Sequence, residues 1–166
     1  MLYKIFISYS TVDLPLVNKI KVALESKAGM GVTVYIAEYS ALPGVRLDED
    51  IKRNLSTCDL FCVLWSRNAK DSGWVQQEIG IAEDRRRLIV PIVLDRDLPP
   101  PGFIQDRKFI PAYEGTDNAI KRLMEIIAAN ASRKTLAIQE QKVKQRNAVT
   151  LLGLGVLILA VLASKD

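Results

Sequence analysis

Trp74 and Glu78 lie four residues apart in the segment SGWVQQEIGIAEDRRR, and both side chains can do chemistry. A carboxylate can move a proton or stabilise a positive charge, and an indole ring can stack on a planar ligand. In a helix the two would lie one above the other on one face. Val75, Ile79 and Ala82 would form the apolar stripe that packs inward. The plain alternative is a half-buried tryptophan at a helix start and a solvated glutamate.

Histidine is absent from all 166 residues, which restricts the chemistry that the chain can perform. A Ser-His-Asp triad, a His-dependent zinc site and a neutral-pH imidazole base are therefore excluded. Cys58 and Cys62 are the only cysteines, and they fall in the apolar run CDLFCVLW. Along a strand they would be roughly 13 Å apart, too far for a disulfide. We predict core cysteines in a reducing compartment and no metal site.

The charge is unevenly distributed along the chain. Residues 1–118 carry 15 basic and 16 acidic side chains, whereas residues 119–147 carry 7 basic and 2 acidic ones. The globular part is therefore not expected to bind nucleic acid. The positive charge lies just before an apolar segment, as is typical beside a membrane.

Residues 148–163, AVTLLGLGVLILAVLA, contain no charged side chain. As a helix they would span roughly 24 Å, somewhat less than the ~30 Å hydrocarbon core of a bilayer. Basic residues crowd only the N-terminal side, so the positive-inside rule places the large N-terminal part in the cytoplasm. We predict a single-pass transmembrane helix at 148–163, joined to the domain by a basic juxtamembrane stalk at 131–147. A buried core helix is the alternative.

Strand-like and helix-like segments alternate over the first 115 residues. We predict strands at 2–8, 32–37, 60–65 and 88–94 and a weaker one in RKFIPAY, with helices in TVDLPLVNKIKVALESKAG, LDEDIKRNLST, the opening segment and NAIKRLMEIIAA. This alternation, with near-continuous apolar strands, predicts a parallel sheet covered on both faces. Pro91 argues against a central position for the fourth strand, because proline cannot donate a ladder hydrogen bond. Such sheets bind ligands outside the carboxyl ends of their strands.

The first loop, SYSTVD, is therefore part of the candidate site. Four of its residues lie where the first strand meets a helix N-terminus, a place able to receive phosphate through backbone N–H groups: Ser8, Tyr9, Ser10 and Thr11. We take Tyr9, Ser10 and Thr11 as candidate substrate-binding residues. The simpler interpretation is that Ser10 and Thr11 cap the helix and that Tyr9 belongs partly to the core.

The loop EYSALPGVR after the second strand is the other part of this edge. Pro43 and Gly44 fit positions i+1 and i+2 of a type II turn, which is a sufficient structural reason for them. Glu38 and Arg46 flank the turn and are candidates for contact with a ligand. The alternative for both is a solvated side chain.

These segments together resemble a Toll/interleukin-1 receptor (TIR) domain. The ordered set carries the resemblance: KIFISYSTVD, ALPGV, CDLFCVLWSRNAKDSGWVQQEIGIA and IVPIVLD. It extends from about residue 3 to 130, so we assign residues 1–130 to a TIR domain. The family implies a flavodoxin-like five-stranded parallel sheet with helices on both faces. Many microbial, plant and some animal members cleave NAD+ at the nicotinamide bond.

The resemblance implies a catalytic role for Glu78, because the essential glutamate of the NAD+-cleaving members sits on the third helix, where WVQQE places it. A carboxylate at the ribose stabilises the oxocarbenium-like sugar that forms as the bond breaks. No histidine is needed, and NAD+ is a substrate here, so no further cofactor is expected. The resemblance also implies that the loop with Pro43 and Gly44 gates the site and makes contacts between assembled TIR domains.

The expected function is a membrane-tethered TIR NADase that forms a TIR–TIR homo-oligomer, in microbial antiviral defence. The product would be ADP-ribose or a cyclic ADP-ribose-type molecule. The alternative is a non-catalytic TIR adaptor that acts only by assembly. Other nucleotide folds fit less well, because Trp65 stands where a phosphoreceiver needs an aspartate and SYSTVD lacks the glycines of a dinucleotide fingerprint. Flavin binding stays open.

Overall fold

The computed structural model describes residues 2–27, 31–36 and 49–163, except for the side chains of residues 27, 103 and 147–163. The contacts divide the chain into two units, Met1–Ile127 and Ala128–Asp166. Four predicted site residues lie outside the described residues: Glu38, Pro43, Gly44 and Arg46.

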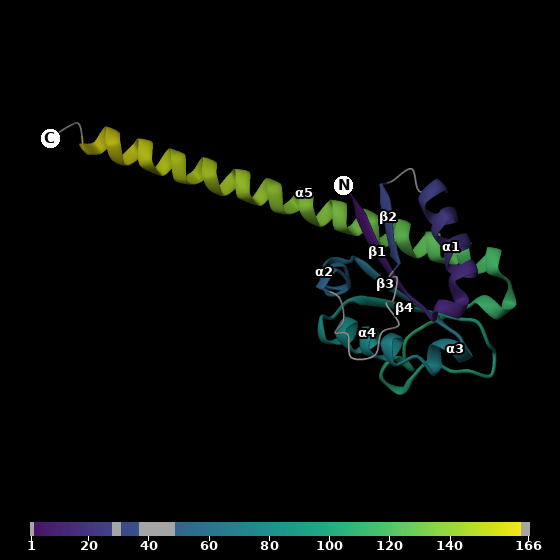
Figure 1. Ribbon diagram of the computed structural model, residues 1–166. Coiled ribbons are helices and arrows are strands. Elements are labelled where there is room, and N and C mark those ends of the chain that lie inside the picture. Colours follow the sequence, from purple (N-terminus) through teal and green to yellow (C-terminus); the bar gives the residue numbers. More distant parts are fainter. Residues whose placement is uncertain (1, 28–30, 37–48, 164–166) are drawn as a thin grey trace. The chain divides into compact units, whose positions relative to one another are not determined.

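A five-stranded parallel sheet forms the centre of the first unit (Figure 1). Its strands are β1 (Tyr3–Ser8), β2 (Val32–Ile36), β3 (Leu60–Trp65), β4 (Leu88–Val93) and β5 (Ile110–Pro111). The spatial order is β2-β1-β3-β4-β5, which is the flavodoxin-like order, and all neighbouring strands run parallel. The predicted fold class is confirmed for the sheet.

Helices connect the strands. They are α1 (Leu14–Lys27), α2 (Glu49–Thr57), α3 (Arg67–Lys70), α4 (Gly73–Asp84) and α5 (Thr116–Ala163), with short 3-10 turns η1 (Thr11–Asp13), η2 (Gly102–Ile104) and η3 (Ala112–Glu114). The single-turn helix α3 is not in the sequence prediction. It forms because Ser66 caps it, and Ser72 then caps a separate helix, α4.

Both faces of the sheet are buried, as the near-continuous apolar strands require. Every residue of β3 is buried, which explains its uninterrupted apolar sequence. On one face a single core cluster joins α2 and α4 to the sheet, and within it the Phe6 and Phe61 rings stack with their centroids 5.7 Å apart. Alternate residues of the strands point to the opposite face, on the side of α1 and the start of α5 (Figure 1). Cys58 and Cys62 are both buried free thiols. Only Cys62 lies in β3, because Cys58 precedes the strand and belongs to the cluster with α2 and α4, so the expectation that both lie on one strand is wrong.

Pro91 lies within β4, which has a neighbouring strand on each side. Pro91 is in register with Val63 of β3, but the pairing with β5 begins only at Ile92. At Pro91 the strand therefore has one partner, and proline is tolerated where only one side of a strand is paired. The objection that the sequence raised against a central position is resolved by the shortness of β5.

α5 is one continuous helix that extends through the predicted stalk and the predicted anchor. Among the residues whose side chains are described, no helix is long and apolar enough to cross a membrane. Residues 148–163 lie in the part of α5 outside that description. The transmembrane helix therefore stays a prediction without support from the structure.

Because the Cys58 thiol is buried, the fold is expected to lose stability at alkaline pH. Burial raises the pKa of Cys58 from its ordinary value near 9 to about 11, and burial also raises the pKa of Cys62 and of Tyr3. A raised folded-state pKa gives stability that is complete below the unfolded-state pKa and is lost as pH rises towards the folded-state pKa. The free energy of unfolding should therefore fall between about pH 9 and 11. Denaturant titrations at several pH values measure it, and Cys58→Ala should show a shallower fall. Parallel profiles for the two proteins would contradict this origin.

Candidate functional site

The candidate site lies where the strand order reverses at the carboxyl end of the sheet. β2 and β3 pair on opposite sides of β1, so the connections that leave β1 and β3 diverge to opposite faces. Open α/β sheets bind ligands at this point. The connection after β1 contains Tyr9 to Asp13, and the connection after β3 starts at Ser66 and leads through α3 to α4.

Glu78 is completely buried on the sheet-facing side of α4. It shares that side with Val75, Ile79 and Ala82, because positions i, i+3, i+4 and i+7 of a helix form one stripe. The alternative of a solvated glutamate is therefore wrong. Fully buried carboxylates are rare in proteins and mark candidate functional positions.

Trp74 lies in the first turn of α4, one turn before Glu78. It is half-buried and packs against the core cluster of α2, α4 and the sheet. The Oγ of Ser72 accepts a hydrogen bond from the Val75 N–H (3.4 Å) and so caps the helix just before the tryptophan. Trp74 is thus only partly covered, and an aromatic side chain that is partly accessible can stack on a ligand.

Ser8 was grouped with the first loop in the sequence analysis, but in the structure it is the last residue of β1. Alternation along β1 places Ser8 on the same face as Phe6, beside Val63 of β3, and α4 contacts β1 on this face. Its side chain is fully buried, and among the described residues its hydroxyl has no hydrogen-bond partner. The period of two along an apolar strand was the signal that could have identified it. A hydroxyl therefore lies in the same layer as Glu78, between the sheet and α4.

The next three residues have different environments. Tyr9 and Ser10 are buried, and Thr11 is exposed. Thr11 begins the 3-10 turn η1, and Ser10 does not cap it with its side chain, although the Ser10 carbonyl accepts from the Asp13 N–H at 2.8 Å. The sequence suggested that this loop leads directly into an α-helix, but α1 starts only at Leu14. The structure supports a core position for Tyr9, and the role of all three in binding a substrate stays a prediction.

Asp13 connects the two loops of the site and was not singled out from the sequence. The Ser66 hydroxyl donates to its Oδ2 at 2.5 Å, and the Asn68 amide donates to its Oδ1 at 3.3 Å. The partners are more than 50 positions apart in the chain, so no local pattern could have shown the contact. The segments after β1 and β3 are therefore tied together by one carboxylate.

Further contacts hold the loops that follow β3, β4 and β5. The Arg67 side chain lies 3.6 Å from a carboxylate oxygen of Asp95, and the Arg96 guanidinium lies 5.4 Å from the centre of the Tyr113 ring. The indole N–H of Trp65 donates to the Pro99 carbonyl at 3.0 Å. Within the described residues no group of acidic or thiol side chains has the arrangement of a metal site.

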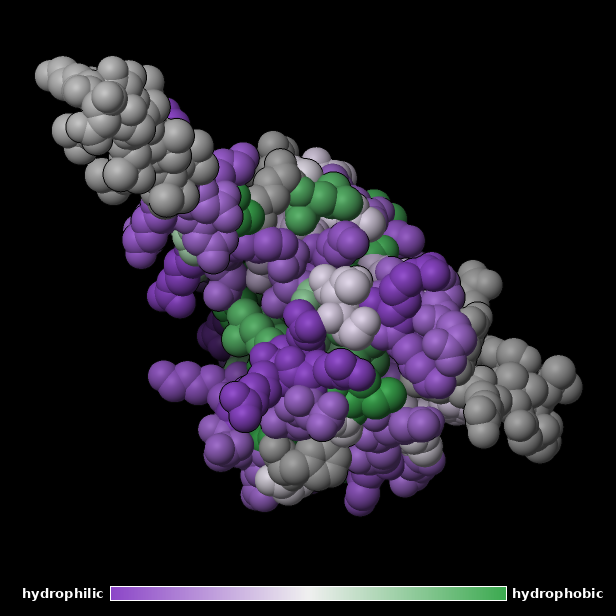
Figure 2. Space-filling view, turned by 90° about the vertical axis from the view of Figure 1, so that its left-hand side faces the viewer, coloured by the Kyte–Doolittle hydropathy of each residue, from purple (hydrophilic) through white to green (hydrophobic). Residues whose placement is uncertain are grey.

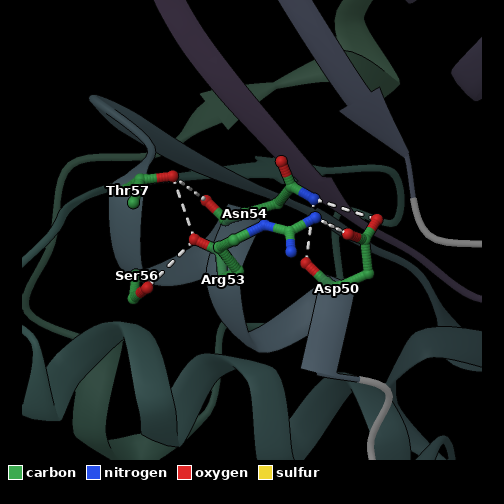
Figure 3. A network of polar contacts seen from close by, with 5 residues as sticks. All are labelled: Asp50, Arg53, Asn54, Ser56 and Thr57. Carbon is green, nitrogen blue, oxygen red and sulfur yellow. Dashed lines mark hydrogen bonds and ion pairs between the residues drawn. The ribbon is translucent and has the colours of Figure 1, made fainter.

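Polar contacts fix both ends of α2 (Figure 3). Asp50 accepts hydrogen bonds from the Arg53 and Asn54 side chains in the first turns, and the Ser56 and Thr57 hydroxyls each donate to the Arg53 carbonyl at 2.9 Å. Beyond α2, the Arg87 guanidinium donates to the carbonyls of Ser56 and Cys58. Arg87 lies in the short connection between α4, which ends at Asp84, and β4, so one side chain joins this connection to the C-terminal end of α2.

A hollow of about 650 Å³ lies on the outer side of α2 and α4. Its lining includes charged side chains of both signs, among them Glu49, Lys52, Arg53 and Arg85, although most of the lining surface is apolar. Figure 2, which views the side of the molecule on the left of Figure 1, shows mainly hydrophilic residues there with smaller hydrophobic areas between them. Glu78 does not line this hollow, because it faces the sheet. The hollow is therefore separate from the candidate site.

The strand order defines an α/β domain of flavodoxin-like topology, and α4, the helix of the buried Glu78, contacts β1 and β3, the two strands that flank the switch point. The family profile described as TIR domain matches residues 5–124. The chain therefore belongs to the TIR-domain family. No sequence among the curated proteins matches it.

Solved structures resemble the chain at low sequence identity. The crystal structure of the TIR domain of the Toll-related receptor TRR-2 from Hydra magnipapillata is 18% identical, with a TM-score of 0.60, over 76% of this chain and 98% of that one. The TIR domains of the activated Roq1 resistosome, which directly recognises the pathogen effector XopQ, are 18% identical, with a TM-score of 0.47, over 81% and 77%. A 2-desoxiribosyltransferase from Leishmania mexicana is 12% identical, with a TM-score of 0.39, over 56% and 65%. The likeness to the Hydra domain supports the TIR fold.

Proposed function

We propose that this TIR domain is an NAD+ nucleosidase that cleaves the nicotinamide–ribose bond, with Glu78 as the catalytic residue. The family includes NAD+-cleaving enzymes and non-catalytic members, so membership alone does not separate the two. One observation carries the proposal, namely the complete burial of Glu78 in α4, a helix that contacts the two strands on either side of the switch point, β1 and β3. A glutamate kept only for solubility would face the solvent.

The chemistry requires one negative charge close to the ribose. As nicotinamide leaves, the sugar becomes oxocarbenium-like, and a preorganised carboxylate stabilises this positive charge as it develops. Nicotinamide leaves as a neutral base, so a second carboxylate acting as an acid is not required. Because Glu78 is shielded from bulk water, its electrostatic effect on the ribose is stronger than at an exposed position. NAD+ reaches it by displacing residues that cover it in this structure.

Trp74 and the first loop supply binding in this proposal. The indole ring of the half-buried Trp74 would stack on a ring of NAD+, and the backbone N–H groups from Tyr9 to Thr11 would bind the phosphates. If Trp74 holds the adenine near the ribose, cyclisation competes with attack by water. The products are then nicotinamide with ADP-ribose or with a cyclic ADP-ribose-type molecule, as a signal in microbial antiviral defence.

The alternative is a TIR adaptor that acts only through TIR–TIR assembly at a membrane. Both functions involve a homo-oligomer, so the oligomeric state does not distinguish them. Nicotinamide release from NAD+ by the purified protein does, because an adaptor releases none. The burial of Glu78 favours the enzyme, since an assembly surface has no need of a carboxylate inside the domain.

Glu78→Gln tests the catalytic assignment. It keeps the shape of the side chain and removes its charge, so turnover should fall by roughly 10²-fold or more, the scale for loss of one preorganised electrostatic group. Nicotinamide release measures turnover, and circular dichroism shows that the protein is folded. Glu125→Gln, which changes an exposed glutamate of α5, should leave turnover unchanged. Wild-type turnover in a folded Glu78→Gln protein would refute the assignment.

Trp74→Ala tests the stacking role. Loss of a stacked base costs roughly 1–3 kcal/mol, so KM for NAD+ should rise by about 10-fold or more, and the ratio of cyclic to hydrolysed product should change. Trp74→Phe keeps an aromatic face and should restore most of the affinity. Mass spectrometry of the products gives the ratio. An alanine variant with unchanged KM and product ratio would show that the ring only packs in the core.

The membrane anchor is proposed from the sequence alone. We propose that residues 148–163 form a single-pass helix with the TIR domain in the cytoplasm. Extraction of membranes with alkaline carbonate should leave the full chain in the pellet and release a variant that ends at residue 147. Release of the full chain would count against an integral anchor.

A further inference from the structure

Asp13 uses both of its carboxylate oxygens on the segment that follows β3. Oδ2 accepts from the Ser66 hydroxyl at 2.5 Å, and Oδ1 accepts from the Asn68 side-chain amide at 3.3 Å. A short O–H···O⁻ contact of this kind is charge-assisted and roughly twice as strong as a neutral hydrogen bond. The β1–α1 connection is thus fastened to the β3–α3 connection across the switch point of the sheet.

Ser66 has no freedom to turn away from this contact. Its side chain is buried, and its Oγ also accepts from the Ala69 N–H at 3.0 Å, which caps α3. The hydroxyl therefore donates in one direction and accepts in the other, and both partners fix its orientation. Loss of Asp13 would leave a buried hydroxyl proton without this acceptor, which is unfavourable.

The position of Ser66 is passed on to α4 through a short and hydrogen-bonded segment. Ser72 N–H donates to the Ala69 carbonyl at 3.2 Å, and the Gln76 side-chain amide donates to the Lys70 carbonyl at 3.2 Å. Only Asp71 and Ser72 separate α3 from α4. The start of α4, with Trp74 and Glu78, is therefore held relative to β1 through Asp13.

We propose that Asp13 is a positioning residue of the NAD+ site, which keeps Glu78 and Trp74 in the geometry that the reaction needs. This inference rests on the proposed function. Asp13 acts through Ser66 and α3, and it contacts no reacting atom. Misplacement of a catalytic group by about 1 Å can reduce a rate by 10²-fold. The contacts of Asp13 with Ser66 and Asn68, which hold the segment that leads into α4, are therefore expected to affect turnover.

Asp13→Asn, Ser66→Ala and the double variant test the proposal as a double-mutant cycle. Asp13→Asn removes the charge and one of the two acceptor oxygens, and Ser66→Ala removes the hydroxyl donor together with the cap of α3, so each change weakens or abolishes the Asp13–Ser66 contact and should lower kcat by roughly 10-fold. The double variant should be no worse than the more impaired of the two single variants. Ser66→Thr keeps a hydroxyl that donates and caps, and it should restore most of kcat. Asp117→Asn is the matched control, because Asp117 also pairs across elements, with Lys19 of α1 at 3.1 Å, but is exposed and lies at the start of α5.

Hydrogen exchange gives a readout that does not involve NAD+. The Ala69 amide and the amides of the first turn of α4 should exchange faster in Asp13→Asn than in wild type, while β3 amides should be unchanged. Additive losses of kcat in the double variant, no rescue by Ser66→Thr, or a loss that only follows the unfolded fraction would overturn the proposal. If the wild-type protein releases no nicotinamide, the proposed function fails. Unchanged exchange of the Ala69 amide in Asp13→Asn would separately refute the positioning role of the Asp13–Ser66 contact.

Discussion

The burial of the Glu78 carboxylate between α4 and the sheet is the main constraint on how the candidate site is built. Burying an ionisable group is unfavourable, so its surroundings must supply stability from other contacts. α4 does this with Val75, Ile79 and Ala82, which fill the rest of the same stripe and join the core cluster. The helix is thereby fixed by its apolar residues, and Glu78 is carried into the interior with them. A site that gives up stability in this way is typical of residues kept for function.

Much of the fold could be predicted because its signals are local. The six buried residues of β3 read as one apolar run, and the alternation of strands and helices was enough for a parallel sheet. The ordered motifs then indicated the TIR topology, and the strand order agrees with it. Pro91 misled only because the extent of β5 could not be read from the sequence. The pairing of a strand depends on its neighbours, which no local pattern contains.

The site was predicted less completely, for the same physical reason. Glu78 was found by type and spacing, but its burial was not, because a carboxylate is expected to be solvated even where its spacing of three from Val75 and four from Ala82 places it on the apolar stripe. Asp13 and Ser66 come together only through the crossover of β1 and β3, so their contact depends on the tertiary structure. α3 was missed because a single turn has no periodicity to detect. The residues of the loop after β2 lie outside the described structure.

Arg87 gives the domain a mechanical property. Its guanidinium donates to the carbonyls of Ser56 and Cys58, so the end of α2 is fastened to the α4–β4 connection, three residues beyond the end of α4. The backbone between the end of α4 and Arg87 is also constrained, since Arg86 adopts a left-handed conformation (φ 51°) that few residues other than glycine take up. α2 and α4 therefore resist sliding past each other.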